Sequence, residues 1–182
     1  MCIRDRFIGA DFVVAQLEVP FEAIEQAFKI ARKQNITTVL NPAPAIELPK
    51  SLLELTDIII PNETEAELLT GISINNESDM KETATYFLDL GISAVLITLG
   101  EQGTYCAYQE QYKMIPACNV KAVDTTAAGD TFIGAFLSEL NKDLSNLESA
   151  IRLANQASSL TVQRKGAQAS IPTRKEVEAE YN

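Results

Sequence analysis

The sequence predicts an α/β fold in which a mostly parallel sheet is covered by helices on both faces. Short apolar runs that are typical of buried strands alternate with longer runs whose apolar residues recur at helical spacing. The strand-like runs are rich in β-branched residues and are bounded by turn residues. Composition agrees, because 182 residues, of which 46% are apolar and 22% charged, suffice for one substantial core.

Turn residues and periodicity define the individual elements. Gly71 and Gly91 end two of the expected helices, and the three prolines within residues 41–49 predict a rigid loop without regular structure. Pro20 suits the first position of the first helix, and residues 103–115 favour a hairpin or meander. We expect strands at residues 12–17, 37–41, 57–61 and 94–99, and helices at residues 20–34, 63–69, 79–90, 129–140, 147–162 and 174–181.

Composition excludes several classes of function. A formal charge of -10 argues against a nucleic-acid surface, and the absence of histidine excludes Ser-His-Asp catalysis and His-ligated zinc. The three separated cysteines, Cys2, Cys106 and Cys118, indicate a reducing compartment. No apolar run approaches the ~20 residues of a spanning helix. We therefore expect a cytoplasmic protein with no membrane partner.

The segment DTTAAGD, residues 124–130, places small residues and a carboxylate where a loop becomes a helix. The first turn of a helix leaves about four N–H groups without helical partners and carries partial positive charge, so it attracts phosphate. Ala127, Ala128 and Gly129 would let a polyphosphate approach the main chain, and Asp130 could take a proton from a hydroxyl nucleophile. The alternative is that Asp130 only caps the helix.

The segment PNETEAELLTG contains a second carboxylate beyond a strand end. Asn62 and Glu65 fit a capping box, in which each side chain bonds the other's backbone. Glu65 could instead orient water around Mg²⁺, which keeps several waters and uses few protein ligands. Both roles can hold together.

Two further segments contain glycines whose role is either to contact a ligand or to form a turn or a helix cap. After the strand that ends near Thr98, Gly100 and Gly103 allow close approach to a ligand or simply form a turn. Further on, Arg164 and Lys165 before Gly166 are typical of a helix C-terminus with a glycine cap.

Taken together, these segments resemble the ribokinase-like carbohydrate kinase family. The resemblance covers nearly the whole chain after residue 6, in family order, through AQLEVP, NPAPAIELP, DIIIPNETEAELLTG, VLITLGEQG, AVDTTAAGDTFIGA and RKGAQAS. The wider family usually has glycine where this chain has Ala127. The AAGD form and the NPAPA loop are similar to the ribose-specific branch.

The resemblance implies a role for each matching residue. Asp130 matches the catalytic base, which contacts the substrate hydroxyl, and Glu18 matches a sugar-contacting carboxylate, although Glu18 could equally be a solvated charge at a strand end. Glu65 matches the carboxylate associated with Mg²⁺ through water. Positions matching the ATP contacts are Asn62, Thr98, Leu99, Gly100, Glu101, Gln102, Gly103, Ala128, Gly129 and Asn155, and those matching a K⁺ site are Asp124, Thr126, Thr161, Arg164, Gly166 and Ser170.

The implied activity is ATP-dependent phosphorylation of D-ribose to D-ribose 5-phosphate, with Mg²⁺ and K⁺ as cofactors. Another sugar or nucleoside kinase of the family, or a nucleotide-binding fragment without catalysis, are the alternatives. A Rossmann oxidoreductase and a P-loop kinase are disfavoured, because the chain has neither GxGxxG after a strand nor GxxxxGK[ST].

The chain departs from the family at its N-terminus. Members begin with the first sheet strands, a small β lid and a GGKGAN-like sugar motif, none of which is found here. We expect residues 7–182 to be a partial domain that keeps the nucleotide half, and residues 1–6 to lie outside the family pattern. Such a fragment should phosphorylate ribose poorly and expose an open sheet edge. The full-length parent is expected to form a homodimer through the missing lid.

Overall fold

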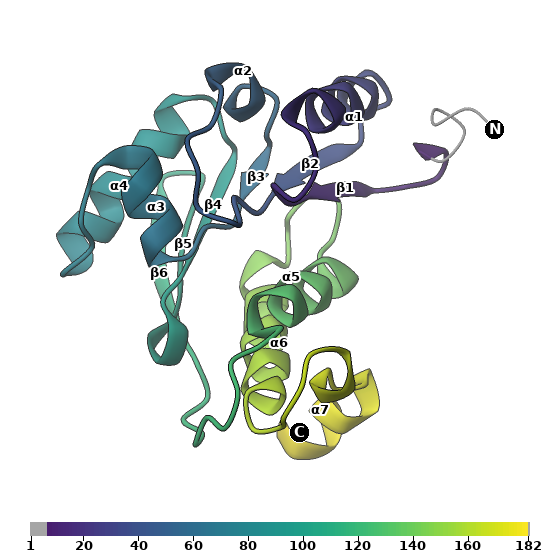
Figure 1. Ribbon diagram of the computed structural model, residues 1–182, viewed down its shortest axis with the longest axis vertical. Coiled ribbons are helices and arrows are strands. Elements are labelled where there is room, and N and C mark those ends of the chain that lie inside the picture. The colour runs from purple at the N-terminus through teal and green to yellow at the C-terminus, as the bar shows by residue number, and fades with distance from the viewer. Residues whose placement is uncertain (1–6, 182) are drawn as a thin grey trace. The chain divides into compact units, whose positions relative to one another are not determined.

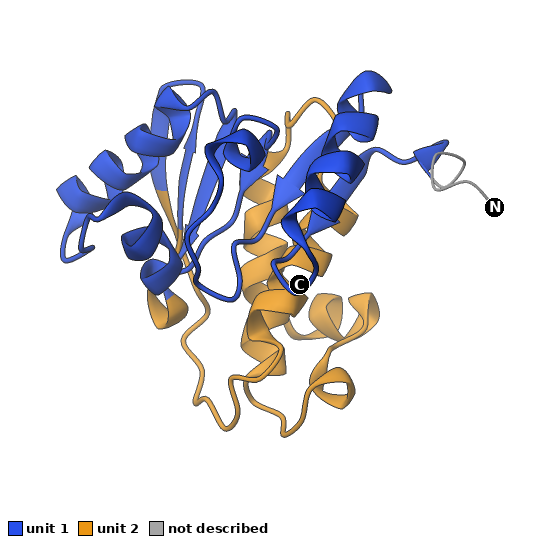
Figure 2. Cartoon of the chain, turned by 45° about the horizontal axis from the view of Figure 1, so that its top comes forward, with its two compact units in different colours: residues 1–99, 105–113 blue, residues 100–104, 114–182 orange. Residues whose placement is uncertain are grey.

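The computed structural model describes residues 7–181, so the expected non-family stretch, Met1–Arg6, lies outside the described residues (Figure 1). The chain divides into two compact units (Figure 2). Unit 1 comprises residues 1–99 and 105–113, and unit 2 comprises residues 100–104 and 114–182.

Four parallel strands form the centre of unit 1. They are β1 (Phe12–Ala15), β2 (Thr37–Leu40), β3 (Ile58–Ile59) and β4 (Ala94–Thr98). Val14 is in register with Val39, Val39 with Ile58, and Ile58 with Ala94. The strands β5 (Gly103–Tyr108) and β6 (Gln111–Pro116) complete a six-stranded sheet in the order β1-β2-β3-β4-β5-β6. The predicted α/β class with a mostly parallel sheet is confirmed.

The helices of unit 1 connect these parallel strands. They are α1 (Phe21–Lys33), α2 (Lys50–Leu53), α3 (Glu63–Thr70) and α4 (Glu77–Asp89). Because the spatial order of β1 to β4 follows the chain, right-handed crossovers put all four helices on one face of these strands. Figure 1 shows this arrangement.

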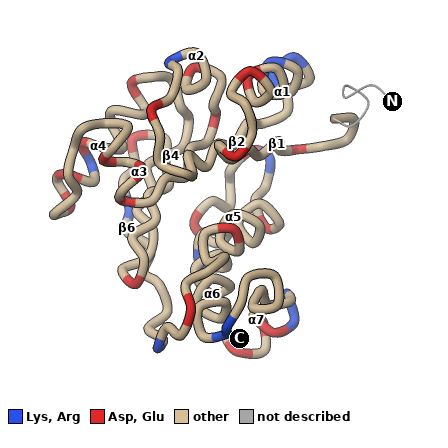
Figure 3. Tube along the Cα trace, viewed as in Figure 1, with Lys and Arg blue, Asp and Glu red and all other residues tan. Residues whose placement is uncertain are grey.

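The core of unit 1 explains why its strands read as continuous apolar runs. Val39, Leu40, Ile58 and Ile59 are fully buried, as are residues 94–97. Figure 3 shows that Lys, Arg, Asp and Glu lie mainly on helices and loops, and β2, β3 and β4 contain none of them. These strands are buried on both faces, which explains why they contain no charged residues.

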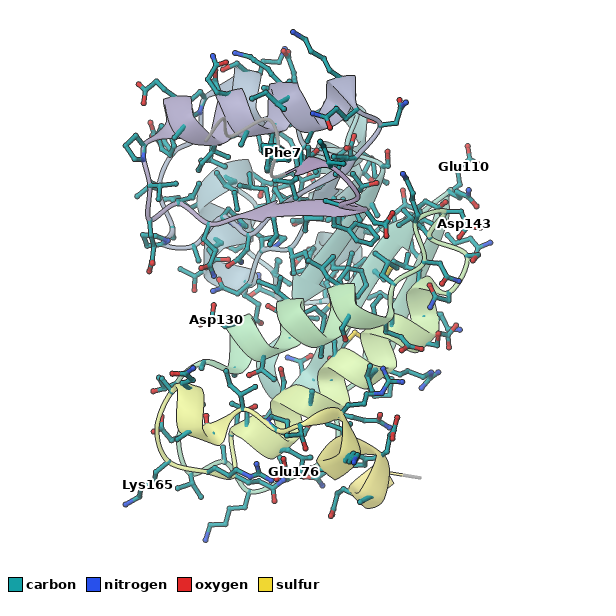
Figure 4. All side chains as sticks on the ribbon, turned by 90° about the vertical axis from the view of Figure 1, so that its right-hand side faces the viewer. Phe7, Glu110, Asp130, Asp143, Lys165 and Glu176 are labelled. Carbon is teal, nitrogen blue, oxygen red and sulfur yellow. The ribbon has the colours of Figure 1, made fainter. Side chains whose placement is uncertain are left out.

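Unit 2 is built on three helices, α5 (Ala128–Glu139), α6 (Leu147–Thr161) and α7 (Arg174–Tyr181). α5 and α6 lie side by side (Figures 1 and 4). α7 packs on α6, where Val177 is buried with Ala157 and Leu160. This pairing of α5 with α6 determines which groups surround the start of α5.

Several boundaries differ from the sequence prediction for local reasons. Pro20 is the N-cap of α1, one position before its first helical residue. α4 begins two residues early because the side chain of Asn76 accepts hydrogen bonds from the N–H groups of Ser78 and Asp79. α2, a single turn after Pro49, was not predicted. Among residues 7–181, no helix has the length and apolar character needed to cross a membrane.

Candidate active site

The start of α5 in unit 2 has an unusual backbone. Ala127 is the N-cap residue and has φ 61° and ψ 10°, the left-handed conformation that costs a non-glycine residue roughly 1 kcal/mol. The Ala127 side chain makes no capping hydrogen bond. The first helical bond runs from the Thr131 N–H to the Ala127 carbonyl, 2.9 Å away. The amides before Thr131 therefore precede the helical hydrogen-bond ladder, as the phosphate-site hypothesis requires.

Asp130 lies in this first turn and is exposed (Figure 4). Gly129 is exposed as well, and a Cβ built on Gly129 would meet no atom within 4 Å among the described residues. The turn thus presents a carboxylate next to an accessible main chain. Since Ala127 occupies the N-cap position, Asp130 does not cap α5, and the capping alternative for Asp130 is wrong.

The loop before α5 is held by the side chain of Asp124. One carboxylate oxygen accepts the Thr126 N–H and the other accepts the Gly166 N–H, each at 3.0 Å. The hydrogen bond from Gly166, and then those from Thr126, lower the pKa of Asp124 to about 2. The N–H groups of Val123 and Asp124 also both bond the Val162 carbonyl. Residues 123–126 are thereby tied to the segment that follows α6.

Three of the six residues matched to a K⁺ site, Asp124, Thr126 and Gly166, meet directly through these bonds. The other three direct their side chains elsewhere. The Thr161 hydroxyl donates to Thr131, and Ser170 donates to the Ala167 carbonyl. Each Asp124 oxygen accepts one amide and keeps a further lone pair. Among residues 7–181, no group of three or more Asp, Glu, Cys or His is arranged to hold a metal.

Arg164 has a different role from the one its position in the sequence indicated. α6 ends at Thr161 with Val162 as its C-cap, so Gly166, at φ 99°, does not cap the helix, and that expectation was wrong. Arg164 instead forms an ion pair with Glu176 of α7 at 2.8 Å. No local pattern in the sequence indicates this ion pair, because the two residues lie 12 positions apart.

In unit 1, polar residues gather beyond the carboxyl ends of the parallel strands. The Gln16 amide donates to Asn41, and Asn41 donates to the Ile60 carbonyl, which links the ends of β1, β2 and β3. Asn62 pairs with Thr98 as a parallel bridge at the ends of β3 and β4. The predicted edge of the sheet therefore exists, and sequence reasoning missed that Asn41 joins it.

Glu18 follows β1 in an exposed turn near the same edge, where its carboxylate is open to solvent. Both alternatives for Glu18, a sugar contact and a solvated charge, fit this position. Its role in binding sugar stays a prediction.

Asn62 and Glu65 form the expected capping box. The Asn62 N–H and side-chain amide donate to the two Glu65 carboxylate oxygens, and the Glu65 N–H donates to the Asn62 side-chain oxygen, all at 2.9 Å. Glu65 is 5% exposed, and burial raises the pKa of Glu65 against the lowering effect of the Asn62 N–H. Contact with Mg²⁺ through water would leave this box in place.

The loop after β4 contains a short 3₁₀ turn, Gly100–Gln102, within unit 2. Gly103 has φ 112°, and a Cβ there would collide with the Ile115 carbonyl, so Gly103 is required by the approach of its own chain. Gly100 has φ 53° and open space around its Cβ position. The turn alternative therefore accounts for Gly103, while residues 100–102 stay accessible.

Asn155 lies buried on α6 and joins this loop to the end of β6. It accepts the Thr104 hydroxyl at 2.9 Å and donates to the carbonyls of Ile115 and Pro116. These bonds hold the start of β5, directly after the candidate nucleotide loop (residues 98–103), against the end of β6. A direct contact between Asn155 and ATP stays a prediction.

Comparison with known proteins identifies the family. The sequence model of the pfkB family carbohydrate kinases matches residues 6–174. The chain belongs to this family. The pfkB match spans every candidate residue from Glu18 to Ser170 and ends where α7 begins.

Among individual relatives, the chain is similar to several ribokinases. The chain is 64% identical over 174 residues to the ribokinase of Staphylococcus aureus, covering 96% of this chain and 57% of that protein. It is 46% identical to the ribokinase of Haemophilus influenzae, covering 92% of this chain and 54% of that protein. A structure of Arabidopsis thaliana ribokinase complexed with ribose and ATP has a TM-score of 0.90 and 32% identity, covering 97% of this chain and 57% of that one. The chain thus spans just over half the length of these relatives.

Proposed function

We propose that this chain supplies the nucleotide-binding and phosphoryl-transfer part of a kinase that phosphorylates the 5-hydroxyl of D-ribose with ATP. The observation that carries the proposal is the start of α5, where Asp130 stands beside an uncapped and accessible first turn. Family membership and 64% identity to a ribokinase support ribose as the sugar. A cytoplasmic location and a dimer formed through the lid that the resemblance predicts belong to the same proposal.

In this reaction the first turn of α5 supplies backbone N–H groups to the transferred phosphoryl group. In a loose transition state, negative charge accumulates on the phosphoryl oxygens, so preorganised amides at a helix start stabilise it. The Asp130 carboxylate orients the sugar hydroxyl and accepts its proton as the new P–O bond forms.

Mg²⁺ and K⁺ are proposed as cofactors with separate roles. Mg²⁺ would neutralise phosphate charge, and Glu65 would contact it through water, which leaves the hydrogen bonds from Asn62 in place. K⁺ would rest on main-chain oxygens of residues 123–126 and 161–170, which the Asp124 carboxylate holds together. Neither residue needs to leave its present hydrogen bonds.

Two measurements test the proposal. Calorimetry with Mg·ATP on this chain should show binding, and a coupled ADP-release assay should show little turnover by this chain alone. The same assay on the chain extended by the N-terminal region that the resemblance predicts should show turnover with ribose over fructose and adenosine. Preference for fructose or adenosine would reassign the substrate, and absence of both binding and turnover would overturn the proposal. Ribose turnover by the chain alone at the rate of the extended protein would refute the expectation of a deficient fragment.

A further inference from the structure

The first turn of α5 has few attachments of its own. Ala127 holds an unfavourable left-handed conformation and contributes no side-chain cap. An uncapped helix start normally frays, because its terminal turn is held by few hydrogen bonds. A phosphoryl-transfer site needs the opposite, since misplacement of a catalytic group by about 1 Å can cost 10²-fold in rate.

A neighbouring helix supplies an attachment at this point. The Ser158 hydroxyl of α6 donates to the Ala128 carbonyl of α5 at 2.7 Å. Ala128 is the first residue of α5, two positions before Asp130. Most serine hydroxyls within helices bond a carbonyl of their own helix. Ser158 instead crosses to another helix and reaches the turn that carries the candidate base.

A second hydroxyl bond reinforces the same contact. One turn further along, the buried Thr161 hydroxyl of α6 lies 3.1 Å from the buried Thr131 hydroxyl of α5 and 3.2 Å from the Ala157 carbonyl of its own helix, so the two acceptors share its proton. Thr131 directly follows Asp130. The two bonds therefore attach α6 to both sides of the Gly129–Asp130 peptide.

We infer that Ser158 is a positioning residue, which fixes the first turn of α5 so that its amides and Asp130 meet the terminal phosphate of ATP in one geometry. The inference rests on the proposed function, and it assigns Ser158 no contact with either substrate. We call the Ser158–Ala128 hydrogen bond the tether. The adenosine end of the nucleotide does not depend on the first turn of α5. Loss of the tether should therefore lower the affinity for ATP and leave the affinity for ADP unchanged.

Ser159 provides a matched control. It is the next residue of α6, and its hydroxyl donates to a carbonyl at the same 2.7 Å, but that carbonyl belongs to Asn155 of its own helix. Ser158→Ala and Ser159→Ala thus remove the same group and a bond of the same length from one helix. Only the first variant detaches α5.

The first test needs no nucleotide. NMR-detected amide exchange should be about fivefold faster at Thr131 and Phe132 in Ser158→Ala than in the unmodified chain, because one hydrogen bond is lost near their acceptors. Ser159→Ala should leave these two amides unchanged, and Ser158→Thr, which keeps a hydroxyl, should restore slow exchange. If Ser158→Ala does not fold, Ser158→Cys fills similar space with a weak donor and replaces it. Equal exchange rates at Thr131 and Phe132 in all the variants would show that Ser158 does not stabilise the first turn of α5, and would overturn the inference.

The second test measures whether the tether affects nucleotide binding. By calorimetry, Ser158→Ala should lose about fivefold in affinity for Mg·ATP and retain its affinity for Mg·ADP. An equal loss for both nucleotides, or the same loss in Ser159→Ala, would mean a merely structural role and would overturn the inference. If the unmodified chain binds neither nucleotide, the proposed function fails, and the positioning inference falls with it even where the exchange data show a tether.

Discussion

The carboxylate of Asp124 reaches 42 residues along the chain to accept the N–H of Gly166 at 3.0 Å. Its other oxygen accepts the Thr126 N–H, so one side chain joins the loop before α5 to the loop after α6. Ionised carboxylates accept such bonds strongly, and the pKa of Asp124 is accordingly lowered from 3.8 to about 2.

This bond predicts a specific dependence of stability on pH. Because the folded pKa of Asp124 lies below the unfolded value, its stabilisation is complete above pH 3.8 and is lost as pH falls towards about 2. Asp124→Asn should have a lower urea midpoint than the unmodified chain at pH 7, and the difference should shrink at pH 3. Asp143→Asn is the comparison for a local bond, since Asp143 accepts the N–H of the nearby Ser145 and its pKa is also lowered by Ser145. An Asp124 difference that did not vary with pH would contradict this prediction.

Replacement of Asp130 by Asn should separate binding from chemistry. Asn keeps the size of the side chain but cannot accept the hydroxyl proton, so kcat of the extended protein should fall by about 10²- to 10⁴-fold. Its affinity for Mg·ATP should stay within about twofold, which calorimetry measures. Normal turnover by Asp130→Asn would remove Asp130 from the mechanism.

The capping box predicts graded effects at Glu65. Glu65→Ala removes both acceptors for Asn62 and should lower the free energy of unfolding by about 1 kcal/mol. Glu65→Gln should cost less, because the Gln oxygen still accepts the Asn62 N–H. Glu63→Ala, an exposed change in the same turn, is the control.

The contribution of Glu65 to stability should change with pH in the opposite direction to that of Asp124. Burial raises the folded pKa of Glu65, so the folded state disfavours its ionised form, and the cost appears as pH rises above 4.5. The urea midpoint of Glu65→Gln relative to the unmodified chain should therefore improve between pH 4 and pH 7. A constant difference would show that Glu65 does not titrate in this range.

The two glycines of the loop after β4, Gly100 and Gly103, should differ in their tolerance of alanine. Gly103→Ala places a Cβ against the Ile115 carbonyl at φ 112° and should cost about 3 kcal/mol or more. Gly100→Ala meets open space and should cost only about 1 kcal/mol for its positive φ. Urea unfolding at neutral pH measures both, and similar costs would contradict the collision.

A buried hydroxyl in α4 predicts a stabilising change. Thr83 is fully buried, and its hydroxyl has no hydrogen-bond partner within the described part of the chain. Thr83→Val keeps the shape and removes the unpaired group, which should raise the free energy of unfolding by about 1 kcal/mol. Thr56→Val is the contrasting change, because the Thr56 hydroxyl donates to the Leu52 carbonyl at 2.9 Å and its loss should destabilise. Thermal denaturation compares the two.

Much of the secondary structure could be predicted because its causes are local. The capping box of Asn62 and Glu65 spans three residues, and the glycine that ends α3 has the left-handed conformation that its position indicated. By contrast, α2 was missed because one helical turn carries too little periodicity to be recognised. The predicted glycine cap at Gly166 was wrong because α6 ends five residues earlier, at Thr161, and only its apolar pattern indicated where it would end.

The sequence by itself determined the α/β class, the order of elements and the motif that starts α5, since spacings of two to four residues encode strands, helices and caps. Tertiary structure alone decided the partners of the site residues. Asp124 meets Gly166, Asn155 meets Thr104 and Ser158 meets Ala128 across 42, 51 and 30 residues. Such bonds form only when packing brings two distant segments within about 3 Å, and no local pattern records that distance.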